Sequence, residues 1–85
     1  MPNPLHRYQY EILRKMLVEA REASRLTQVQ VAMRLRKPQS FVSKYERGER
    51  RLDFTEFLEV ADILQIEVGD FVGRYREASH KADAS

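Results

Sequence analysis

Residues 28–47 have the sequence QVQVAMRLRKPQSFVSKYER, and this stretch decides the fold because it holds two short helical patterns on either side of a break. Thr27 and Gln30 have the spacing of a capping box, which predicts a helix that starts after Thr27 and ends near residue 35. Proline disfavours helix in the residue before it but suits a first helical position, so a second helix is predicted from Pro38 to about residue 47. Ala32 is small enough for the two helices to cross closely. The stretch therefore predicts a helix-turn-helix.

Apolar residues continue at helical spacing on both sides of this unit, and no strand pattern interrupts them. Residues 8–24 contain one such stripe, and a second capping box, Asp53 with Glu56, predicts another helix to about residue 64. The inward stripe of that helix is Phe54, Phe57, Leu58, Ala61 and Leu64. A last short helix holds Val68, Phe71, Val72 and Tyr75. We therefore expect an all-α, five-helix domain over residues 1–77, followed by a flexible tail over residues 78–85.

The charge of the chain is polarised along its length. The formal net charge of the 85 residues is only +2, but residues 34–51 contain seven basic and two acidic side chains. Residues 52–73 contain six acidic and no basic side chains. One basic block on a nearly neutral protein favours a polyanionic partner on one face, although an ordinary solvated face would have the same composition.

Cysteine is absent, which excludes disulfides, thiolate zinc sites and thiolate catalysis. No apolar run is long enough for a membrane span, and the first ten residues lack the apolar segment of a signal peptide, so a cytoplasmic protein is expected. The two histidines lie far apart, and no metal or other cofactor is predicted. Ser40 and Lys44 lie one turn apart, but an exposed helix offers no oxyanion hole, so no enzyme activity is predicted.

The second helix of the central unit turns short polar groups and one cation outward on its first turns. These residues are Gln39, Ser40, Ser43 and Lys44. Glutamine can pair with adenine through two hydrogen bonds, and lysine can reach the acceptors of guanine, so we interpret this face as a major-groove reader. The competing interpretation is that these are plain surface residues.

The motifs LTQ at 26–28, VA at 31–32 and QSFVSKYERG at 39–48 resemble the phage repressor/Cro-like (XRE-type) helix-turn-helix regulators. The similarity covers about residues 13–75. The resemblance implies a compact repressor-like domain that binds double-stranded DNA and regulates transcription. It also implies that Gln28 braces Gln39, that Arg21 and Glu46 form a partly buried ion pair, and that residues 48–51 follow the DNA backbone.

Two residues of the turn depart from the family pattern. Arg36 occupies the usual place of a left-handed glycine, at a cost of about 1–2 kcal/mol, and Lys37 replaces an apolar residue. With these two included, the candidate phosphate contacts are Gln28, Arg36, Lys37, Arg47, Arg50 and Arg51.

One recognition helix contacts only a few base pairs, so we expect a homodimer that reads a palindromic operator. Apolar residues near the C-terminal end are the candidate interface: Ile66, Val68, Phe71, Val72 and Tyr75. Two alternatives remain open. The chain could be an antitoxin that binds a toxin protein and autoregulates its operon, or a module that binds only proteins. As a DNA-binding regulator it could also contact RNA polymerase.

Overall fold

The structure, a computed structural model, describes the backbone of residues 4–84 and, within that range, the side chains of residues 8–81. This part of the chain forms five α-helices and no strand, which confirms the predicted all-α fold. The helices are α1 (Pro4–Ala23), α2 (Gln28–Leu35), α3 (Gln39–Glu46), α4 (Phe54–Ile63) and α5 (Val68–Ala84).

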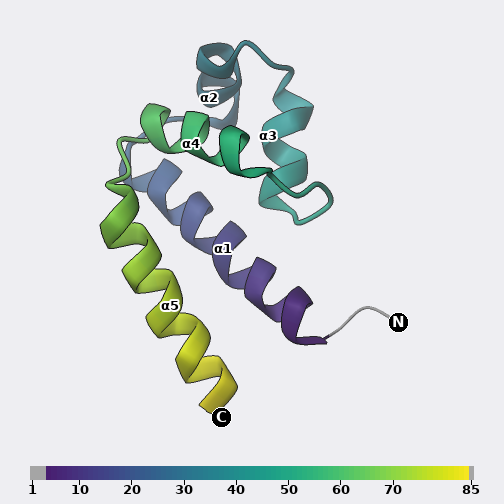
Figure 1. Ribbon diagram of the computed structural model, residues 1–85. Helices are drawn as coiled ribbons and strands as arrows, with labels where there is room; N and C mark the ends of the chain where they lie inside the picture. The colour runs from purple at the N-terminus through teal and green to yellow at the C-terminus, as the bar shows by residue number, and fades with distance from the viewer. Residues whose placement is uncertain (1–3, 85) are drawn as a thin grey trace.

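The helices α1 and α5 lie side by side and run in opposite directions, while α2, α3 and α4 gather at one end of this pair (Figure 1). Every helix contributes to one core. Its innermost side chains are Leu17, Val31, Val42, Tyr45, Val60 and Phe71. Within the described range, no helix has the length and apolar character that a membrane crossing requires.

Both predicted capping boxes are present and start α2 and α4. Thr27 Oγ1 accepts from the Gln30 amide (3.1 Å), and Gln30 Oε1 accepts from the Thr27 amide (2.8 Å). Asp53 Oδ1 accepts from the Glu56 amide (2.7 Å), and Glu56 Oε1 accepts from the Asp53 amide (2.9 Å). Each box satisfies two amides that a helix start would otherwise leave unpaired, so these two boundaries were readable from sequence.

The turn between α2 and α3 closes through a left-handed residue. Arg36 has φ +60° and ψ +43°. Its amide donates to Met33 O (3.2 Å), and the Lys37 amide donates to Ala32 O (3.0 Å), which is the Schellman pattern. The same pattern follows α1 at Arg25 (φ +59°) and α4 at Gln65 (φ +57°). Arginine thus takes the conformation usual for glycine, and two further left-handed residues had no sequence signal.

Replacing Gln65 with glycine is expected to raise the free energy of unfolding by about 0.5–1 kcal/mol. The substitution relieves the left-handed penalty of about 1–2 kcal/mol, and the greater freedom of glycine in the unfolded chain offsets part of that gain. Urea unfolding measures the change. Glu59→Gly, at an exposed position inside α4, should have the opposite sign and lower stability by about 1 kcal/mol. Destabilisation by Gln65→Gly would contradict the left-handed assignment.

Three sequence expectations differ from the structure. The tail predicted at 78–85 instead continues α5 through Ala84, with Ser79 buried, and Ser85 lies outside the described residues. Three of the seven residues from 78 to 84 are alanine and one is lysine, and both residue types favour helix, which explains this extension. The first helix begins at Pro4, as suits proline at a first helical position, rather than at residue 8. Phe54 was expected in the core but is 69% exposed, because it occupies the first position of α4.

Candidate functional site

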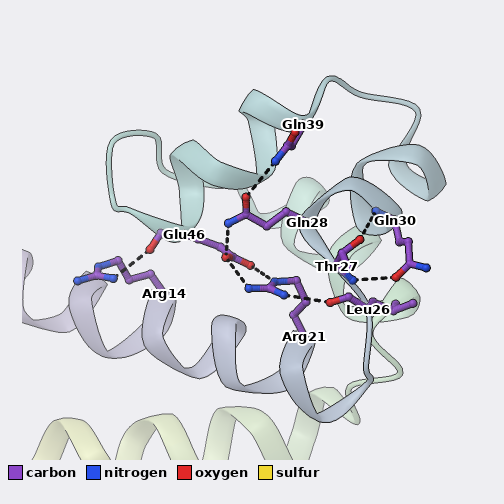
Figure 2. Close-up of polar contacts among 8 residues, drawn as sticks. All are labelled: Arg14, Arg21, Leu26, Thr27, Gln28, Gln30, Gln39 and Glu46. Atoms are coloured by element: carbon purple, nitrogen blue, oxygen red, sulfur yellow. Dashed lines mark hydrogen bonds and ion pairs between the residues drawn. The ribbon is translucent and has the colours of Figure 1, made fainter.

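Glu46, in the last turn of α3, is the centre of a polar network that joins three helices (Figure 2). Arg21 of α1 donates from Nε to Glu46 Oε2 (2.7 Å) and from Nη2 to Oε1 (3.2 Å). Its remaining terminal nitrogen donates to Leu26 O (3.0 Å). The Glu46 side chain is only 5% exposed and that of Arg21 16%. The structure thus brings together the two residues that the resemblance paired, and they fix α1 to the end of α3.

The network continues from Glu46 to the start of α3 through two glutamines. Gln28 Nε2 donates to Glu46 Oε1 (2.8 Å), and Gln39 Nε2 donates to Gln28 Oε1 (3.4 Å). Figure 2 shows the resulting line of side chains from Arg21 to Gln39. Gln39 itself is exposed, and its Oε1 has no hydrogen-bond partner among the described residues. One amide hydrogen and the carbonyl oxygen of this side chain therefore remain available to a ligand.

The other residues predicted to read bases lie on the same short helix but differ in exposure. Ser40 and Lys44 are exposed. Ser43 is half-buried, and its hydroxyl donates to Ser40 O (3.3 Å) within the helix. The structure therefore presents Gln39, Ser40 and Lys44 more openly than Ser43.

Four of the basic residues proposed for phosphate contact are exposed: Arg36, Lys37, Arg47 and Arg51. Lys37 Nζ lies 5.0 Å from the centre of the Phe41 ring, and Arg47 Nε lies 2.6 Å from Glu49 Oε2.

Arg50, one of the predicted phosphate ligands, already forms an ion pair within the chain. Its two terminal nitrogens donate to Glu56 Oε1 (3.0 Å) and Oε2 (2.8 Å), and its guanidinium lies over the Phe41 ring at 4.6 Å. The hydrogen bond from Arg50, followed by that from the Asp53 amide, lowers the pKa of Glu56 to about 2. The pair therefore stays charged at neutral pH, and we assign Arg50 a structural role in its loop.

Two residues of α1 contact the end of α3 and the following loop, a role that no sequence pattern predicted for them. Arg14 Nη1 donates to Glu46 O (2.9 Å), and the Tyr10 hydroxyl donates to Arg50 O (3.0 Å). Burial raises the pKa of the Tyr10 hydroxyl, which keeps it a donor. The four-residue spacing of Tyr10 and Arg14 places them on one face of α1, which was the only signal in the sequence.

The predicted dimer residues do not form one surface. Phe71 is 2% exposed and belongs to the core, so it offers little surface to a partner. The other four are half-buried: Ile66, Val68, Val72 and Tyr75. Ile66 lines a hollow with Met16 and Ala20. Val72 and Tyr75 line a different groove, of about 360 Å³, whose other walls are Leu13, Leu52, Asp53, Phe54, Phe57 and the edge of Phe71.

The family model described as Helix-turn-helix matches residues 17–71, well over half of the chain. No curated protein gave a significant match. The matched range contains the whole network from Arg21 to Gln39 and residues 47–51 after α3, whereas Tyr10 and Arg14 precede it.

Proposed function

The chain belongs to the phage repressor/Cro-like (XRE-type) helix-turn-helix family of DNA-binding transcription regulators, and from this premise we propose that it is a repressor that binds a palindromic operator as a homodimer. In this proposal α3 enters the major groove. Gln39, Ser40 and Lys44 contact base edges, and Ser43 supports them from the same helix.

The observation that carries the proposal is the hydrogen-bonded line from Arg21 through Glu46 and Gln28 to Gln39. A free glutamine side chain loses rotamer freedom when it binds, and a side chain already held by its neighbours loses less. Adenine offers one acceptor and one donor in the major groove, which match the free amide hydrogen and Oε1 of Gln39. The network thus supports direct readout of an adenine.

The exposed basic residues around α3 supply the part of binding that does not depend on sequence. We assign phosphate contacts to Arg36, Lys37, Arg47 and Arg51, with Gln28 at the start of α2. Such contacts fix the register of a protein on the duplex, while base contacts select the site. Arg50 is left out of this set because Glu56 occupies its terminal nitrogens.

Gln39→Ala is expected to weaken specific binding by about 1–3 kcal/mol and to relax the preference at one or two base pairs. Binding-site selection from random DNA, repeated with wild type and variant, measures the change in consensus. Gln65→Ala removes an exposed glutamine from the turn that follows α4 and should leave the consensus unaltered. An identical consensus for Gln39→Ala and wild type would remove Gln39 from the groove.

A further inference from the structure

The residues that follow α3 form a loop with three basic side chains, which we define as the basic loop, residues 47–51. We infer that Tyr10, Arg14 and Glu56 are positioning residues for DNA binding, because together they hold the basic loop in the shape that presents Arg47 and Arg51. The inference rests on the proposed function and extends it to the N-terminal half of α1, which precedes the matched helix-turn-helix range.

The basic loop is attached to its surroundings at three places. At its start, Arg14 Nη1 binds Glu46 O (2.9 Å), and the side chain of Arg14 packs beside Gly48, where an added Cβ would lie 3.2 Å from Arg14 Cδ. In its second half, the Tyr10 hydroxyl binds Arg50 O (3.0 Å). From the other side, Glu56 of α4 binds both terminal nitrogens of Arg50.

These attachments also set the direction of the Arg51 side chain. The Arg51 guanidinium lies 5.1 Å from the centre of the Tyr10 ring, so the same tyrosine that fixes the backbone at Arg50 supports the next cation. A cation over an aromatic face is attracted by the ring electrostatically, which favours the Arg51 rotamer that lies over Tyr10. A loop ordered before binding avoids part of the entropy cost of binding a phosphate.

Substitution of Glu56 can distinguish a positioning role from a simple effect of charge, because the two predict opposite changes in DNA affinity. Glu56→Gln removes a negative charge close to the basic loop, so a purely electrostatic effect would tighten DNA binding. The amide of glutamine still serves the capping box of α4, but it cannot hold the Arg50 fork as a carboxylate does. If Glu56 positions the loop, the more positive variant should therefore bind DNA more weakly.

The first experiment compares wild type, Glu56→Gln and Glu59→Gln on the selected operator over a range of salt concentrations. Glu59 is exposed on the same helix, so its substitution makes the same change in charge without touching the loop. We expect Glu59→Gln to bind as tightly as wild type or slightly more tightly. We expect Glu56→Gln to bind about three- to tenfold more weakly, a change equal to the net value of one ordinary hydrogen bond. Its slope of log affinity against log salt should be smaller, by up to about 0.9 for each lost phosphate contact.

The second experiment uses a change without charge. Tyr10→Phe keeps the ring and removes only the hydroxyl, and Tyr8→Phe makes the same change at an exposed tyrosine two residues earlier. In wild type the amides of Glu49 and Arg50 both donate to Lys44 O, at 2.9 and 3.3 Å. Tyr10→Phe should speed hydrogen exchange at these two amides, weaken DNA binding about threefold and leave exchange in the core unaltered. Tyr8→Phe should do none of these.

The outcomes separate the two levels of the proposal. Wild-type protein that binds no DNA fragment in a salt-dependent manner would remove the proposed function itself. If wild type binds DNA and Glu56→Gln binds it as tightly as Glu59→Gln or more tightly, the positioning role of Glu56 is contradicted. The proposed function would remain intact. Weaker binding with an unchanged salt slope and unchanged loop exchange would also contradict the positioning role, because the loop would then be as ordered as in wild type and no phosphate contact would have been lost.

Discussion

Arg21→Ala is expected to lower the free energy of unfolding by about 3 kcal/mol, a large share of the stability of so small a domain. The substitution leaves the 5%-exposed carboxylate of Glu46 with only the amide of Gln28 as a side-chain donor, and it also removes the donor to Leu26 O. Breaking a fully buried pair costs about 3–5 kcal/mol, and the partial exposure of Arg21 places the expected loss at the lower end.

Thermal and urea unfolding of wild type, Arg21→Ala and Arg34→Ala measure this effect. Arg34 is exposed in the last turn of α2, and its removal should change stability by less than about 0.5 kcal/mol. The double variant Arg21→Met, Glu46→Met removes both charges and should regain part of the loss, because no unpaired buried charge remains. If Arg21→Ala were as stable as Arg34→Ala, the ion pair would have no structural role.

The parts of the fold that sequence predicted are those set by local chemistry. Thr27 with Gln30 and Asp53 with Glu56 are complete capping boxes, and they start α2 and α4 as expected. A capping box involves only four consecutive residues, so its outcome does not depend on the rest of the chain.

The parts that sequence did not predict depend on tertiary contacts. Arg25 and Gln65 adopt left-handed conformations that neither residue type favours, because the helices they end must turn sharply to pack on one core. Phe71 was predicted as an interface residue of a short last helix, yet it fills the space beside Phe57, with ring centres 5.5 Å apart. An apolar stripe has the same pattern in a core and in an interface, so the sequence could not distinguish the two.

The candidate site also has contacts that sequence predicted and contacts that only the folded structure shows. The hydrogen-bonded line from Arg21 to Gln39 could be predicted from sequence, because the family motif has these residues at fixed spacing. The contact of Arg50 with Glu56 crosses a loop, and the contact of Tyr10 with Arg50 O joins residues forty positions apart. No periodic pattern links such residues, so only the folded chain places a phosphate candidate such as Arg50 in an internal ion pair.

Phe54→Gln, combined with Tyr75→Asp, is expected to give a folded monomer that binds its operator about 10²–10⁴-fold more weakly than wild type. Phe54 is 69% exposed at the rim of the groove that Val72 and Tyr75 line, and an exposed aromatic beside an apolar groove is typical of an interaction surface. We propose this groove as the dimer contact, which keeps Val72 and Tyr75 of the predicted interface and leaves out Ile66 and Val68. Two copies related by a two-fold axis would read half-sites about 34 Å apart, and losing the second half-site forfeits the gain from linked binding.

Sedimentation at micromolar concentration and operator titration measure the two parts of this prediction. Phe54→Gln alone tests the surface with little risk to the fold, because most of that side chain already lies in water. Tyr8→Asp introduces the same charge as Tyr75→Asp at an exposed tyrosine away from the groove, and it should remain dimeric. Wild-type protein that sediments as a monomer both free and on operator DNA would contradict the dimer. A double variant that remains dimeric would contradict this interface. A dimer through the groove would have to bury an aspartate and a glutamine without hydrogen-bonding partners, which costs free energy.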